Sequence, residues 1–166
     1  PFSERYSGIY SITRNLYKNL NGSQIIFEEI NNDLRLSFQE RWAFSNEYGI
    51  VKTSELQNLT EEDRKIQILD GLQNIIPADI SEHLQAIRSN LADAYKKIEL
   101  YNEVIGIYSL SARIVDRAIP SEALYATVVW HTGLDAENIL LSSRQLDNFR
   151  QGLALESEVD IRAEKG

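Results

Sequence analysis

The sequence predicts an all-α protein, an elongated antiparallel bundle of four or more helices around one central helix of about 40 residues. Three observations predict it. A long apolar repeat at helical spacing fills the stretch between Pro77 and Pro120, shorter segments on both sides keep the same spacing, and the composition (43% hydrophobic, 25% charged) is that of a globular protein. At 166 residues the chain can bury one core. We therefore expect a single domain spanning residues 1–166.

The central helix is expected over residues 79–119. Its apolar residues recur at alternating steps of four and three, which keeps one side of a helix against its neighbours. Asp79 with Glu82 forms a capping-box-like start, and Pro120 forbids continuation. A helix of about 40 residues is about 60 Å long. Its apolar residues form a coiled-coil-like seam, which can be buried only against other helices of comparable length. The seam consists of Ile80, Leu84, Ile87, Leu91, Ala94, Ile98, Tyr101, Ile105, Tyr108, Ala112, Val115 and Ile119.

Three helices are expected before the central one. Residues 2–20, which include Tyr6, keep helical spacing and end at the turn sequence Asn-Gly-Ser at 21–23. A second helix follows over 27–42, and Gly49 then interrupts the period as a plausible C-cap. The third is expected over 60–76, with Thr60 and Asp63 at its start.

Two segments after Pro120 complete the expected bundle. Ser121 can cap a helix carrying the apolar residues of 124–129, and Asp135 can cap a last helix over 139–153. The stretch "YATVVWHTG" is the best strand candidate in the chain, because residues 127–130 are β-branched or aromatic. That alternative stays open, and the helical pattern of the neighbouring segments favours the all-α interpretation.

Charge and composition exclude several classes of partner. The chain has 17 basic and 25 acidic residues, a net charge of −8, without a basic cluster, so we expect no nucleic-acid binding. Cysteine is absent, which excludes disulfides and thiolate metal sites. No apolar run approaches the ~20 residues that cross a bilayer. The chain begins without Met, which suggests a piece of a longer protein, so membrane attachment is expected only through segments outside it.

Catalytic and metal-binding motifs are missing from the sequence. His83 and His131 are the only histidines, and Ile80 and Val128 occupy the positions where a di-metal bundle places glutamate. His83 lies in a helical context, as a phosphotransfer histidine would, yet lacks the flanking motif. Neither a Gly-x-Ser-x-Gly nucleophile turn nor a glycine-rich phosphate loop occurs. We therefore predict no catalytic residue, no metal, no cofactor and no enzymatic activity.

A ligand site is predicted from aromatic and polar residues near the seam. Tyr101 and Tyr108 lie on the seam with Arg113 close by, and a buried tyrosine hydroxyl needs a partner, so these residues can form a small polar pocket. Trp130 and His131 precede a helix break where a cleft could form. The alternative is simple packing, with the hydroxyls reaching solvent and the tryptophan anchoring a turn.

In layout, the predicted bundle resembles the extracytoplasmic four-helix sensor modules of bacterial transmembrane receptors, in size, acidity, lack of cysteine and long helices. The resemblance implies a non-catalytic ligand-sensing or signal-transducing domain of a membrane-anchored receptor. A small molecule or protein would bind between helices or at a homodimer seam and displace a helix. The alternative is a scaffold or protein-interaction bundle without a small ligand, in the cytoplasm. Extra apolar residues on the central helix favour a protein partner: Leu100, Val104, Ile107, Leu110 and Ile114.

Overall fold

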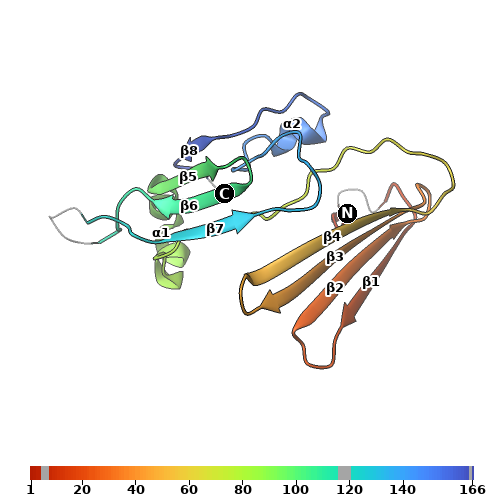
Figure 1. Ribbon diagram of the computed structural model, residues 1–166, viewed down its shortest axis with the longest axis horizontal. Coiled ribbons are helices and arrows are strands. Elements are labelled where there is room, and N and C mark those ends of the chain that lie inside the picture. The colour runs from red at the N-terminus through yellow and green to blue at the C-terminus, as the bar shows by residue number, and fades with distance from the viewer. Residues whose placement is uncertain (5–7, 116–120, 165) are drawn as a thin grey trace. The chain divides into compact units, whose positions relative to one another are not determined.

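A computed structural model describes residues 1–4, 8–115, 121–164 and 166, and it is rich in β-strands (Figure 1). The chain divides into two compact units, Pro1–Asp70 and Gly71–Gly166. Each unit contains one four-stranded antiparallel sheet. The predicted all-α bundle, its coiled-coil seam and the helical sensor or scaffold function built on it are therefore wrong. Tyr6, Ile119 and Pro120, which the helix prediction used, lie outside the described residues.

The first sheet is a meander in which each strand pairs with the next along the chain. The turn predicted at 21–23 is present, but it joins two strands. Gly22 lies in one hairpin turn and Gly49 directly after another, with φ of +69° and +70°, a conformation that glycine adopts without strain. The helices predicted over 2–20 and 27–42 are wrong. The strands are β1 (Ile12–Lys18), β2 (Gln24–Asn31), β3 (Leu36–Ser45) and β4 (Gly49–Asn58).

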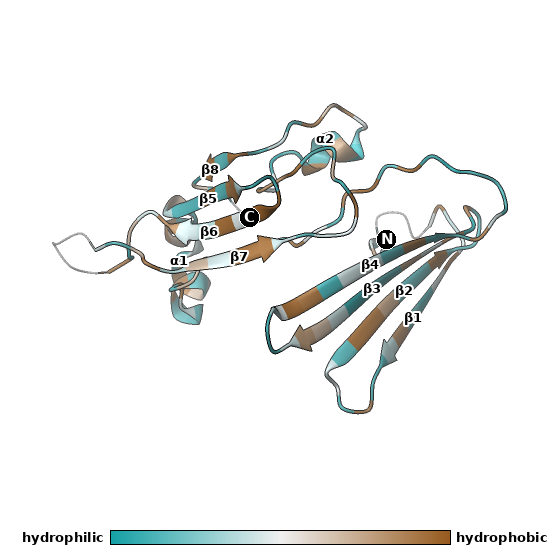
Figure 2. Cartoon of the chain, viewed as in Figure 1, coloured by the Kyte–Doolittle hydropathy of each residue, from teal (hydrophilic) through white to brown (hydrophobic). Residues whose placement is uncertain are grey.

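Hydropathy changes in short blocks along β2, β3 and β4, as Figure 2 shows, and the large aromatic residues of β3 gather on one side of the sheet. In "SFQERWAFS" of β3, Phe38, Trp42 and Phe44 are separated by even steps and share one side. The helical interpretation selected Phe38 and Trp42 because a step of four also satisfies a helix. Phe44, two residues further on, fits the strand period alone.

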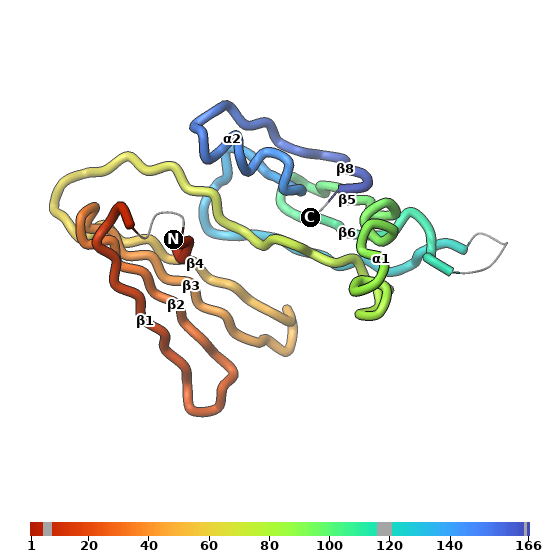
Figure 3. The backbone as a smooth tube through the Cα atoms, turned by 180° about the vertical axis from the view of Figure 1, so that it is seen from behind, coloured from red at the N-terminus to blue at the C-terminus, as the bar shows by residue number. Residues whose placement is uncertain are grey.

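The segment after β4 contains neither helix nor strand among residues 59–81. The helix predicted over 60–76 is therefore wrong. Figure 3 shows the segment as an open curve without a coil. Among the described residues, no helix is both long and apolar enough to cross a membrane.

The second unit begins with a helix and continues as a sheet whose strand order is β7-β6-β5-β8. All its strand pairs are antiparallel. The strand alternative for residues 127–130 is confirmed by β7, and the helix predicted over 124–129 is wrong. The helix predicted over 139–153 is reduced to the short α2. The elements are α1 (Glu82–Ala94), β5 (Lys96–Tyr101), β6 (Ile105–Leu110), β7 (Ala126–Trp130), α2 (Leu146–Arg150) and β8 (Asp160–Arg162).

Only the first part of the predicted central helix is helical. α1 spans 13 residues, and its N-cap is Ser81, whose Oγ accepts a hydrogen bond from the Leu84 N–H at 3.1 Å. After α1 the chain turns back between β5 and β6, where Asn102 and Glu103 have φ of +49° and +60°. Two consecutive positive φ values are typical of the tight turn that joins hairpin strands. The hairpin therefore replaces the second half of the predicted helix.

One side of the second sheet forms the hydrophobic core. Ile98 lies opposite both Tyr108 and Ile161, so three strands contribute to one row. The Tyr108 hydroxyl donates a hydrogen bond to the Leu141 carbonyl at 3.3 Å. The remaining side chains packed on this cluster are Ile75, Leu100, Val129 and Ile139.

A buried carboxylate fixes the segment that covers this core. Glu158 accepts hydrogen bonds from the backbone N–H groups of Leu141 and Ser142, at 2.8 and 2.7 Å. Its other oxygen accepts from the Ser142 hydroxyl and from Nε2 of Gln145, at 3.2 and 2.9 Å. Because hydrogen bonds to a charged acceptor are stronger than neutral ones, this carboxylate holds the covering layer in place.

Candidate functional site

The apolar side of the first sheet is an exposed aromatic surface. In its central row Leu16 lies opposite Phe27, and at one end Phe44 lies opposite Ile50. The exposed fractions of these side chains are 62% for Leu16, 37% for Phe27, 73% for Phe44 and 62% for Ile50. We call this surface the aromatic face and define it as Leu16, Phe27, Phe38, Trp42, Phe44 and Ile50.

A shallow hollow of about 450 Å³ lies on the aromatic face, lined by Phe2, Phe27, Glu40 and Trp42. The Phe2 ring lies 6.2 Å from the Phe27 ring and 6.0 Å from the Phe38 ring, centre to centre. The Phe2 backbone nitrogen donates a hydrogen bond to the Glu29 carboxylate at 2.6 Å. Phe2 therefore covers part of the aromatic face and forms one wall of the hollow.

Charged side chains on the same side of the sheet form ion pairs. Nε of Arg14 lies 2.9 Å from the Glu29 carboxylate. Nζ of Lys52 lies 3.2 Å from the Glu40 carboxylate and also contacts the Asp70 carboxylate. Pairing lowers the cost of holding these charges beside an apolar surface. The hollow is therefore bordered by neutralised polar groups.

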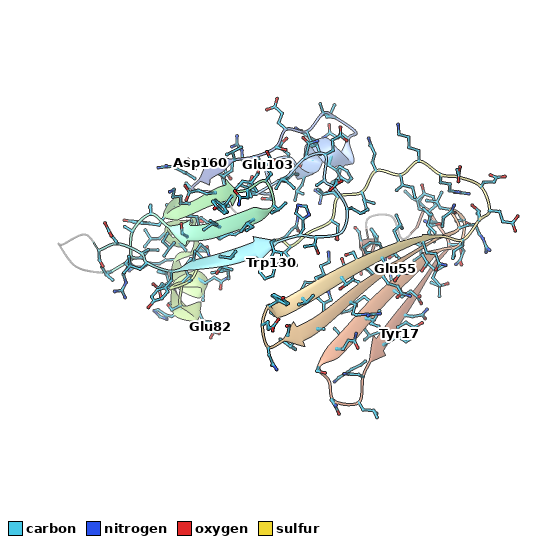
Figure 4. All side chains as sticks on the ribbon, in the orientation of Figure 1. Tyr17, Glu55, Glu82, Glu103, Trp130 and Asp160 are labelled. Atoms are coloured by element: carbon cyan, nitrogen blue, oxygen red, sulfur yellow. The ribbon has the colours of Figure 1, made fainter. Side chains whose placement is uncertain are left out.

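The opposite side of the first sheet carries a compact hydrogen-bond network. Glu28 accepts hydrogen bonds from Nδ2 of Asn15 at 2.7 Å, from the Tyr17 hydroxyl at 2.9 Å and from Nε2 of Gln39 at 2.6 Å. These side chains come from three neighbouring strands, and Figure 4 labels Tyr17 on β1 together with Glu55 on β4. The network therefore ties β1, β2 and β3 together.

The electrostatics of this network favour a structural role. The hydrogen bonds from Asn15, Gln39 and Tyr17 hold the pKa of Glu28 below its usual value. The hydrogen bond to Glu28, together with burial and the charge of that carboxylate, raises the pKa of Tyr17. Both groups keep one protonation state near neutral pH, Glu28 charged and Tyr17 neutral. Near neutral pH, Glu28 and Tyr17 are therefore unsuited to transfer a proton as a general acid or base.

The two units differ in what they bury. Among the described residues, every buried hydrophobic side chain lies in the second unit, whereas the buried residues of the first unit are the polar Glu28, Glu29 and Ser37. An antiparallel sheet with one apolar side is normally covered on that side. The aromatic face is therefore the strongest candidate surface for binding.

The structure brings together two of the five residues predicted to bind a ligand. Tyr101 and Trp130 both lie opposite Ile105, so they share one row on the second sheet, and Figure 4 labels Trp130 there. Tyr108 faces the other side and lies in the core, where burial and the charge of Glu158 raise its pKa.

The other two predicted residues lie in loops. Arg113 follows β6, and its backbone N–H donates a hydrogen bond to the Ser121 carbonyl at 2.9 Å. His131 is exposed and follows the end of β7. The ligand-binding role of the five residues stays a prediction.

A second hollow, of about 170 Å³, lies in the second unit next to α1. It contains the ion pair between Lys96 and Asp93, whose charged atoms are 2.8 Å apart. Its volume is below the ~300 Å³ at which pockets for small-molecule ligands begin. None of the five predicted ligand residues lines this hollow or the one on the aromatic face.

The aromatic face was missed at the sequence level because its strands were interpreted as helices. The signal was present in "FQERWAF", where aromatic residues occupy every position of one strand side except that of Glu40. Phe2 and Phe27 carried no such signal, because their contact joins residues 25 positions apart in sequence.

No protein-family model matches the chain, and no curated protein matches it. Among the described residues, no group of three or more His, Asp or Glu side chains is arranged to hold a metal ion. The predictions about enzymatic activity, partners and localisation stay predictions.

Proposed function

We propose that this chain is a non-catalytic protein-interaction module, and that its aromatic face docks against an apolar β-sheet face of a partner protein. One observation carries the proposal. The aromatic face exposes Leu16, Phe44 and Ile50, while the buried hydrophobic residues of the described chain all belong to the other unit.

The physical argument begins with exposed area. Burying apolar surface is worth roughly 25 cal/mol per Å², and large aromatic side chains contribute most of the binding energy at protein interfaces. Phe27, Trp42 and Phe44 supply such anchors from neighbouring strands. Two sheets pack face to face at about 10 Å by interdigitating side chains of this kind. A second sheet is therefore the partner surface that best matches four strands with one apolar side.

Charge placement is consistent with this partner. The Arg14–Glu29 and Lys52–Glu40 ion pairs lie among the apolar residues of the face. Because each of these charges is paired, its place within the face is compatible with burial against a partner. A small ligand is a weaker candidate, because the hollow is open and four side chains line it.

Site-specific photo-crosslinking tests the proposal. A benzophenone amino acid is placed at Phe44 on the aromatic face, or at Thr53, which is exposed on the polar side of β4, in cells that produce this chain. We expect a discrete protein cross-link from position 44 and none from position 53. No cross-link from position 44, or the same product from both positions, contradicts the proposal.

A binding measurement then separates docking from chance proximity. The cross-linked protein is purified, and its affinity is measured for the wild-type chain, for Phe44→Ser/Ile50→Ser and for Leu134→Ser. Leu134 is the matched control, because it is equally exposed but lies in the second unit. We expect the double variant to bind about tenfold or more weakly and the control to bind like the wild type. Equal affinities would contradict the proposal.

A further inference from the structure

The segment Arg64–Asp70, with the sequence "RKIQILD", has the composition of a strand but no strand partner. Ile66, Ile68 and Leu69 have exposed fractions of 41%, 49% and 39%, large for aliphatic side chains. In the part of the chain that the structure describes, no backbone–backbone hydrogen bond joins residues 63–70 to other residues. Alternating isoleucines in an uncovered backbone are typical of a segment that pairs with another strand.

On one side of this segment the charges are arranged symmetrically about its centre. In an extended conformation Arg64, Ile66, Ile68 and Asp70 share one side, in the order positive, apolar, apolar, negative. Consider two copies paired antiparallel with Gln67 opposite Gln67. Each Ile66 then lies opposite an Ile68, and each Arg64 lies opposite an Asp70. Directly opposed pairs of these kinds stabilise a sheet.

We propose that residues 64–70 pair antiparallel with the same segment of a second copy of this chain, across a two-fold axis. Self-complementarity favours a second copy over an unrelated strand, because the segment supplies both members of every cross-strand pair. The Lys52–Asp70 ion pair fits this arrangement, since a carboxylate can accept from two cations at once. The two paired segments are short and bury little surface, so we expect a weak and reversible dimer. None of residues 64–70 lines the hollow on the aromatic face, and Asp70 contacts that side of the sheet through its ion pair with Lys52.

The full chain is tested by sedimentation equilibrium over a range of concentrations. We expect a reversible monomer–dimer equilibrium. Arg64→Asp places like charges opposite each other in two symmetric pairs, so we expect dimerisation to weaken about tenfold. Lys65→Asp is the matched control, with the same change of charge on the other side of the segment, and we expect a clearly smaller effect. A second control, Phe44→Ser, leaves the dimer unchanged.

A double variant that swaps the charges of residues 64 and 70 tests whether dimerisation can be restored. Arg64→Asp combined with Asp70→Arg restores the opposed charges between copies, so we expect dimerisation to recover in part, because Asp70→Arg also removes the Lys52–Asp70 ion pair within each copy. Hydrogen exchange of residues 64–70 is expected to slow as the concentration rises. A chain that stays monomeric, equal effects of Arg64→Asp and Lys65→Asp, or a double variant without recovery would each overturn the proposal. Loss of the dimer in Phe44→Ser would overturn it too, and would assign self-association to the aromatic face instead.

Discussion

The two sheets of this protein have the same number of strands and the same antiparallel pairing, yet among the described residues only the second sheet has a buried hydrophobic core. In the second sheet, Ile98, Tyr108 and Ile161 form a buried row covered by Leu141. In the first sheet, the Phe2 ring contacts Phe27 and Phe38 on the apolar side, and Phe44 remains largely exposed.

The difference shows what strand pairing alone provides. Alternating sequences are sufficient to pair strands, but the free energy of burial requires a second layer. The second unit builds that layer from its own chain, with Glu158 holding the covering segment through Leu141 and Ser142. The first unit contributes few residues to such a layer, and its stability depends more on polar links such as the Glu28 network.

The largest effect is expected from Ile98→Asp. An unpaired carboxylate in the buried row of the second sheet should cost more than about 4 kcal/mol and unfold that unit. Ile105→Asp is the matched control, because Ile105 lies on the other, partly exposed side of the same hairpin. Residue-resolved hydrogen exchange measures both variants. Similar losses of protection would contradict the assignment of the core to one side.

Glu158→Ala should have the next largest effect. It leaves the N–H groups of Leu141 and Ser142 buried without their acceptor, which should cost about 2–3 kcal/mol in the second unit. Glu156→Ala removes an exposed carboxylate two residues earlier and should change the free energy of unfolding by less than about 0.5 kcal/mol. Chemical denaturation followed by circular dichroism compares them, and equal midpoints would refute the role given to Glu158.

The smallest effect, confined to the first unit, is expected from Glu28→Gln. Loss of a charged acceptor for three donors should cost about 1–2 kcal/mol at neutral pH. The pKa of Glu28 is lowered in the folded chain, so its carboxylate stabilises the fold above the unfolded pKa, and that contribution is lost as pH falls through the lower folded pKa.

The pH dependence supplies the control for this prediction. The wild-type first sheet should lose protection on acidification below about pH 4.5, the usual value for this carboxyl, and the variant should lack that component. Parallel pH profiles for the wild type and Glu28→Gln would contradict the network's contribution.

Part of this fold was accessible from the sequence. The turn at 21–23 and the strand alternative in "YATVVW" rest on local signals and are present in the structure, whereas the helix is capped by Ser81 in place of the predicted Asp79. The prediction of the central helix was wrong because the positions of Ile98 and Tyr108 fit the helical spacing of the seam and also fit a hairpin, in which the two residues lie opposite each other. The turn between them uses Asn102 and Glu103 at positive φ, without glycine, and so gave no clear signal.

The candidate site could not be derived in the same way. The contact between Phe2 and Phe27 and the convergence of Asn15 and Gln39 on Glu28 depend on strand register. Register is set by which residues pair across the sheet. That pairing could not be inferred from the sequence, because the strands were interpreted as helices.

Native-state hydrogen exchange across the whole chain tests the central claim most directly, because it compares the two sheets in one molecule. If the first sheet lacks its covering layer, the amides of β2 and β3 should exchange much faster than those of β5 and β6, which should exchange through unfolding of the second unit. Equal or greater protection of β2 and β3 would contradict the account, because the aromatic face would then already be covered.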